Sequence, residues 1–116
     1  MRIANQTDPA SIAKILAHAI GATRVILFGS QARGDAHSTS DWDFLLVLPA
    51  GAWMNSFDTE LELIRTAHKS LWDAGIDISA DLIPMTEAAF ERGDNVLARM
   101  VWLEGQTLFQ SGVAHA

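Results

Sequence analysis

The chain has 116 residues, 49% of them hydrophobic, which is enough to bury a core. It has no cysteine, which excludes a disulfide framework. The net charge of −6, with only eight lysine and arginine residues, disfavours nucleic acid as a direct substrate, because phosphate backbones are held mainly by basic side chains. The length predicts a single domain over residues 1–116. The sequence shows no signal-peptide core and no apolar stretch of about twenty residues, which predicts a cytoplasmic protein that is not bound to a membrane.

The first predicted element is a helix that begins at Asp8-Pro9 and ends near Gly21. Aspartate followed by proline is typical of a helix start, and glycine is typical of a helix end. The residues between them place apolar side chains at helical spacing, which gives the helix one face for burial. These side chains are Ile12, Ile15, Leu16, Ala19 and Ile20.

A strand over residues 25–28 and a turn at Gly29-Ser30 follow. Four consecutive apolar residues that include a β-branched pair, cut off by a glycine, are too few for a helix. Glycine lets the backbone approach a ligand closely, and a serine offers both a hydroxyl and an amide to phosphate oxygens. Ser30 is not expected to be a hydrolase nucleophile, because the Gly-x-Ser-x-Gly pattern is absent. Arg33 is either a phosphate-binding guanidinium or a surface arginine near the turn.

A second strand begins around Asp41-Trp42-Asp43 and ends at Pro49. Side chains two positions apart in a strand share a face, so Asp41 and Asp43 point one way and Trp42 the other. Two neighbouring carboxylates repel each other unless a cation lies between them, and Mg²⁺ prefers such oxygen ligands. An isolated Asp-x-Asp is more simply a solvated turn, so the pair gains meaning only with partners.

The remaining pattern predicts a loop over 50–56, a long amphipathic crossover helix over 57–75 and a strand over 76–84 that Pro84 ends. A short helix over 86–92 and a final helix capped by Asp94 complete the chain. Three strands with intervening helices predict an α/β (α+β) fold, a small mixed sheet with helices on one face and the other partly open. The histidines are scattered, so no histidine metal cluster is expected.

Asp77, Ser79 and Asp81 fall on one side of the third predicted strand. Either carboxylate could serve as the partner of the Asp-x-Asp pair. The plain alternative for both is an exposed strand residue paired with water or a lysine.

The sequence resembles the nucleotidyltransferase superfamily of DNA polymerase β. The resemblance rests on Gly29-Ser30, then ten residues that contain Arg33-Gly34, then Asp41-x-Asp43. It is strongest to minimal nucleotidyltransferases, the MntA-type antitoxins of HEPN–MNT toxin–antitoxin pairs. It extends over nearly the whole chain, to the segment 104–109, with departures at Gln31, where a basic residue is common, and Trp42, where a smaller aliphatic residue is usual.

This resemblance implies the polymerase β-like nucleotidyltransferase palm. It implies that Gly29, Ser30 and Arg33 bind a nucleoside triphosphate, with ATP as substrate. It also implies that Asp41 and Asp43 bind Mg²⁺, with two ions expected. Asp81 matches the third carboxylate of the family, as metal ligand or base, and is preferred to Asp77.

The implied activity is transfer of AMP from ATP to a hydroxyl on a HEPN ribonuclease toxin, which would make the chain an antitoxin. One alternative is an antitoxin that neutralises a HEPN partner by binding alone. Another is a small-molecule nucleotidyltransferase that modifies an antibiotic, acting as a homo-oligomer. A complete set of three carboxylates favours an enzyme, because a protein that only binds a partner does not need them.

Overall fold

The computed structural model describes residues 8–34, 41–49, 57–93 and 95–111, so the predicted loop over 50–56 lies outside it, as does Asp94. The prediction of Asp94 as the cap of the final helix was wrong, because the side chain of Asn95 caps that helix by accepting from the Ala98 amide. Four strands form one sheet in the order β3-β2-β1-β4. They are β1 (Arg24–Phe28), β2 (Trp42–Leu48), β3 (Ala80–Thr86) and β4 (Gln106–Gln110). The described helices are α1 (Pro9–Ile20), α2 (Ser30–Arg33), α3 (Phe57–Asp73), α4 (Glu87–Arg92) and α5 (Val96–Glu104).

Local signals at the helix ends act as predicted. The Asp8 side chain accepts the Ser11 amide at the start of α1, and Gly21 ends the helix in the left-handed conformation with φ +73°. The side chain of Thr86 caps α4 in the same way by accepting from the Ala89 amide. The predicted helices over 57–75 and 86–92 are confirmed as α3 and α4, and their observed ends differ from the predicted ones by one or two residues.

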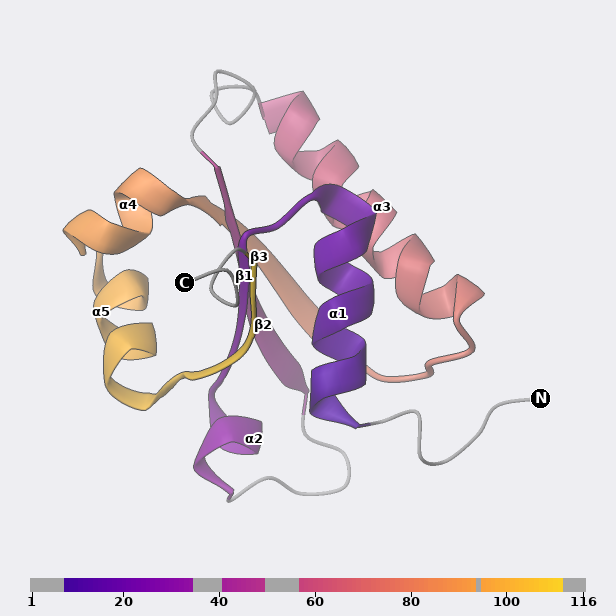
Figure 1. Ribbon diagram of the computed structural model, residues 1–116, viewed down its shortest axis with the longest axis horizontal. Helices are drawn as coiled ribbons and strands as arrows, with labels where there is room; N and C mark the ends of the chain where they lie inside the picture. Colours follow the sequence, from indigo (N-terminus) through magenta and orange to yellow (C-terminus); the bar gives the residue numbers. More distant parts are fainter. Residues whose placement is uncertain (1–7, 35–40, 50–56, 94, 112–116) are drawn as a thin grey trace.

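The sheet is mixed, and its pairing defines one functional end. β1 and β2 run antiparallel, with Phe28 opposite Asp43. β2 and β3 run parallel, joined by the crossover helix α3, with Asp43 opposite Asp81. The last residue of β1 and the first residues of β2 and β3 consequently meet at the same end of the sheet, where α2 also lies (Figure 1).

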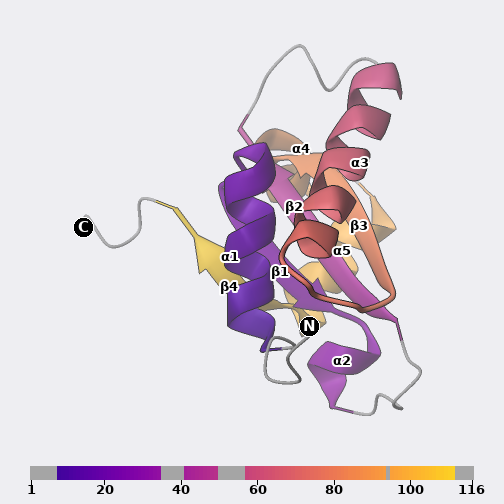
Figure 2. The same cartoon turned by 90° about the vertical axis from the view of Figure 1, so that its right-hand side faces the viewer.

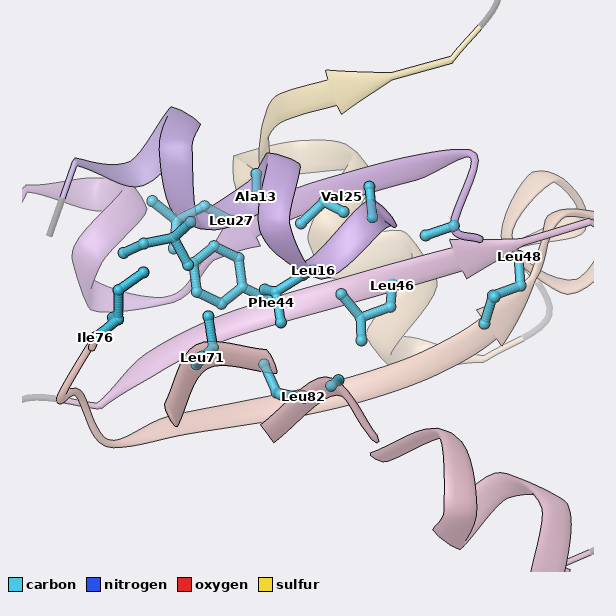
Figure 3. Close-up of a cluster of buried hydrophobic side chains, with 14 residues drawn as sticks. Ala13, Leu16, Val25, Leu27, Phe44, Leu46, Leu48, Leu71, Ile76 and Leu82 are labelled. Carbon is cyan, nitrogen blue, oxygen red and sulfur yellow. The ribbon is translucent and has the colours of Figure 1, made fainter. Parts of the chain in front are cut away.

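One face of the sheet is covered by α1 and α3 (Figures 1 and 2). Alternate residues of β1 and β2 point into this layer and pack against buried residues of both helices, as Figure 3 shows. Burying one such side chain contributes about 1.5 to 3 kcal/mol. The sheet residues of this core are Val25, Leu27, Phe44, Leu46, Leu48 and Leu82. Trp42 packs against the same core and stacks on Phe44, so this side of β2 is apolar, as predicted.

The opposite face is covered in part by α4 and α5, which lie across the sheet from α1 and α3 (Figure 1). Phe90 of α4 and Val101 of α5 pack there against Ile26, Leu45 and Val47. The α/β fold with a mixed sheet is confirmed. The expectation of helices on one face only was wrong, because the last two helices are themselves amphipathic and bury a second, smaller core.

Two strand assignments also need correction. The segment 106–110, for which no strand was predicted, forms the strand β4 and pairs antiparallel with β1. Pro84 does not end the third strand but lies inside it, buried. β3 pairs only with β2 in the described sheet, so half of its amides point away from the ladder, and a proline at such a position costs no strand hydrogen bond.

No helix in the described ranges is long and apolar enough to span a membrane.

Candidate active site

Asp43 and Asp81 lie side by side at the functional end of the sheet. They are register partners on the parallel strands β2 and β3, and the Asp81 side chain forms a hydrogen bond with Asp43. Strand alternation places both carboxylates on the face that α4 and α5 cover only in part, since Asp43 shares its side with Leu45. Asp41 precedes β2 and is exposed, yet its charge acts on Asp43.

The environment of Asp43 disfavours its charged form. Burial is the largest cause and raises the pKa of this carboxyl, and the negative charges of Asp81 and Asp41 raise it further. The hydrogen bond with Asp81 acts in the same direction, while the Arg33 guanidinium lowers the pKa. Two carboxylates in contact need a proton or a cation between them. The site is therefore built to attract positive charge.

The turn at Gly29 lies directly against Asp43. Gly29 has φ +78° and ψ −156°, a conformation that only glycine adopts without strain. A Cβ at this position would overlap with the Oδ2 atom of Asp43. The predicted turn then continues as one helical turn, α2, in which the Gly34 amide donates to the Ser30 carbonyl at 3.0 Å. The backbone thus brings Ser30 and Arg33 to the carboxylates.

Glu104, at the end of α5, is a site residue that the sequence analysis missed. Its Oε2 atom accepts the Gly29 amide at 2.9 Å and the Arg33 Nη1 donor at 3.0 Å. The only signal in the sequence was its place at the start of the segment 104–109. The Gly29 amide already has an acceptor, so the contribution of Gly29 is the backbone conformation of the turn. Ser30 is the turn residue that is suited to donate to phosphate.

The predicted site residues therefore separate into two groups. Gly29, Ser30, Arg33, Asp43 and Asp81 come together, with Asp41 at the margin. Asp77 does not join them. It precedes β3, is exposed, and lines a cavity beside α3 together with Trp72 and Ile78.

The donors at the site fit a magnesium ion. Within the described residues, no group of three or more histidine, cysteine, aspartate or glutamate side chains is arranged to hold a metal ion. Mg²⁺ does not require such a group, because it binds proteins through one or two carboxylates and keeps its other positions for water and phosphate oxygens. Burial first and the neighbouring Asp81 carboxylate second raise the pKa of Asp43, which is consistent with this type of site.

Solved structures with the same fold include the following three. A toxin–antitoxin structure with AMP-PNP has a TM-score of 0.57 and 24% identity, and the match covers 85% of this chain and 70% of that one. A candidate nucleotidyltransferase from Sulfolobus solfataricus has a TM-score of 0.58 and 21% identity, covering 90% and 78%. A mutant of the toxin–antitoxin MntA-HpeT has a TM-score of 0.55 and 20% identity, covering 85% and 70%. At these identities the likeness establishes the fold.

Among proteins with curated functions, none matches the chain significantly. The sequence family described as the nucleotidyltransferase domain matches residues 10–105. This range runs from α1 to the residue after Glu104 and includes every residue of the site. The resemblance inferred from the Gly-Ser and Asp-x-Asp motifs is thereby confirmed, and the chain belongs to the nucleotidyltransferase domain family.

Proposed function

We propose that this nucleotidyltransferase transfers a nucleoside monophosphate from a nucleoside triphosphate, with ATP as donor, to a hydroxyl group. The observation that carries the proposal is the contact between Asp43 and Asp81 beside the Gly29-Ser30 turn. It combines an acidic pair that attracts cations with a turn suited to phosphate at one end of the sheet.

In the proposed reaction, the acceptor oxygen forms a bond to the α-phosphorus, the bond between the α- and β-phosphates breaks, and pyrophosphate leaves. Asp81 takes the proton of the acceptor hydroxyl, and Ser30 and Arg33 hold phosphate oxygens. Asp43, with Asp41 and Asp81, would hold Mg²⁺, which when bound neutralises charge that develops on the phosphates. The work of the chain is positioning and electrostatic stabilisation.

We place the acceptor hydroxyl on a HEPN-type toxin, which makes the protein an antitoxin. Two solved structures of the same fold are toxin–antitoxin structures, one of them with AMP-PNP. The chain also presents an apolar surface to a partner. This surface, the α5 stripe, consists of Val96, Met100 and Leu103, which are 75%, 36% and 90% exposed and recur at helical spacing.

The same stripe supports a second candidate function, an antitoxin that neutralises its partner by contact alone. An exposed apolar stripe on a helix is a common partner-binding surface, and binding through it needs no nucleotide. The two functions differ in whether inhibition of the partner depends on the carboxylates.

The test is to incubate the protein with Mg²⁺, α-labelled ATP and a purified HEPN-type toxin. We expect label on the toxin with the wild-type protein. Asp43→Asn and Asp81→Asn should reduce transfer by about 100-fold or more, because a positioned base alone contributes that much. Asp41→Asn should also reduce transfer, and Asp77→Asn is the matched control that should leave it unchanged.

Each alternative has its own result. Inhibition of the toxin that survives all of the aspartate substitutions, without label on it, would identify the contact-only antitoxin. Label on an aminoglycoside instead of the toxin would identify a small-molecule enzyme. Equal loss of transfer in Asp77→Asn would contradict the assignment of the site to Asp43 and Asp81.

A further inference from the structure

The segment from Glu104 to Gln106 holds α2 at both of its ends. At the first end, Glu104 Oε2 accepts from the Gly29 amide at 2.9 Å. At the other end, the same oxygen accepts from Arg33 Nη1 at 3.0 Å, and Gln106 Nε2 donates to the Ala32 carbonyl at 2.9 Å. The turn that carries Ser30 is therefore attached to a segment more than 70 residues further along the chain.

Packing fixes the position of Glu104. The next residue, Gly105, lies so close to β1 that a Cβ there would be 2.6 Å from the Val101 carbonyl oxygen and 2.7 Å from Ile26 Cγ2. Its amide donates to the Val101 carbonyl at 2.8 Å and closes α5. The Glu104 side chain is only 24% exposed. The end of α5 is thus seated on the sheet and directs this carboxylate at the turn.

We propose that Glu104 is a positioning residue of the nucleotide site, a proposal that rests on the function proposed above. It aligns the Gly29-Ser30 backbone and holds the Arg33 guanidinium beside Asp43. Hydrogen bonds between charged groups are short and directional. An arginine side chain that is already ordered by such a bond loses less conformational entropy when it binds phosphate. A turn held in place before the nucleotide arrives binds it more tightly.

The competing interpretation is that Glu104 blocks the site by occupying donors meant for phosphate. Two observations favour positioning. Glu104 contacts the Gly29 amide, whereas the hydroxyl predicted to bind phosphate belongs to Ser30, and a guanidinium can serve several acceptors at once. In addition, the packing of Gly105 holds the carboxylate in place, while a blocking residue has to move away when nucleotide binds.

The two interpretations predict opposite changes in nucleotide affinity. We expect Glu104→Ala to raise the KM and Kd for ATP with Mg²⁺ by about 10- to 100-fold, by analogy with the loss found when groups that orient metal ligands are removed, with a smaller change in kcat. Glu104→Gln should have an intermediate effect, because its amide oxygen still accepts from Gly29 but carries no charge for Arg33. Tighter binding by Glu104→Ala, or unchanged KM, would overturn the proposal.

The matched control is Glu91→Ala. Glu91 lies on α4, on the same side of the sheet, and pairs with Arg24 at 3.5 Å, but it does not contact the turn. This variant loses an ion pair of the same type and should keep the KM of the wild type. If it raised KM as much as Glu104→Ala does, the effect would be a general consequence of lost surface charge, and the proposal would fail.

Hydrogen exchange provides a measurement that does not depend on activity. We expect the amides of residues 29–34 to exchange faster in Glu104→Ala than in the wild type and in Glu91→Ala. Unchanged exchange would overturn the proposal even if the enzyme is active. Faster exchange in a protein whose wild type neither binds nor transfers nucleotide would support the ordering of the turn by Glu104 and refute the proposed function, so the two failures are distinguishable.

Discussion

The Asp43 carboxyl lies beside Asp81 on a partly covered face, and its pKa is raised above the usual 3.8 by burial first and by neighbouring negative charges second. The folded protein therefore retains this proton at pH values where the unfolded chain has lost it. Between the two pKa values the folded state binds more protons, so stability falls as pH rises through this window, and the whole penalty is present above it. We expect metal-free Asp43→Asn to have a higher Tm than the wild type at neutral pH.

The measurement is thermal unfolding in EDTA at a series of pH values from about 3.5 to 8. The Tm advantage of Asp43→Asn should shrink as the pH falls toward 3.8, where both states of the wild type become protonated. Asp77→Asn, an exposed aspartate outside the site, should follow the wild type throughout. A Tm difference that does not vary with pH would show that the gain comes from packing and not from the charge.

At the level of single residues, the sequence predicts which carboxylates form the site better than it predicts long-range contacts between side chains and the backbone. Strand alternation narrowed the partner of the Asp-x-Asp pair to Asp77 or Asp81, and the family resemblance preferred Asp81, which lies opposite Asp43. Glu104 could not be found in this way. Its contact with Gly29 joins positions 75 residues apart and depends on how tightly Gly105 packs on β1, which no local pattern encodes.

At the level of elements, amphipathic helices and apolar strands were predictable because their patterns are local. α1, α3, α4 and α5 have the 3.6-residue period, and β1, β2 and β3 have apolar runs between turn signals. β4 is five residues with only two apolar positions, Leu108 and Phe109. Its strand conformation comes from pairing with β1, a non-local interaction that outweighs weak propensity. For the same reason the second apolar core under α4 and α5 was not foreseen.

The α5 stripe leads to a prediction for this element. Replacing Leu103 by serine removes the most exposed apolar side chain of the stripe, which is 90% exposed. We expect the variant to weaken binding to the proposed HEPN-type partner by about tenfold or more, as does the loss of a residue that contributes strongly to an interface, with little change in Tm. Binding would be measured by isothermal titration calorimetry.

The matched control is Phe57→Ser, since Phe57 is also an exposed apolar residue, at 72%, but lies on α3, which covers the other face of the sheet (Figure 1). It should bind the partner as the wild type does. Stronger weakening by Phe57→Ser than by Leu103→Ser would assign the interface to α3 instead.

In the molecule as a whole, the acidic site adds to a chain that already carries a net charge of −6. Cations and cation-bound nucleotides are therefore favoured over polyanions such as RNA. The helices α1 and α3 stabilise one side of the sheet fully, while α4 and α5 leave the end with Asp43 and Asp81 accessible. The site thus lies at an accessible end of the sheet, apart from the two apolar cores, and a ligand bound there should raise stability by mass action.

The charge of Asp43, which lowers stability without ligand but is needed to bind it, predicts a reversal of stability order. Magnesium with ATP, in the absence of acceptor, should raise the Tm of the wild type by about 10 °C at a concentration near 100 times Kd, because a ligand that binds only the folded state contributes about 2.7 kcal/mol there. Asp43→Asn should gain little. The variant is thus expected to be the more stable protein in EDTA and the less stable one with ligand, and Asp77→Asn should gain as much as the wild type. Equal gains in Tm for all three proteins would mean that nucleotide binds without Asp43. If the order of stability reverses with magnesium and ATP but not with ATP alone, the acidic pair is a cation site.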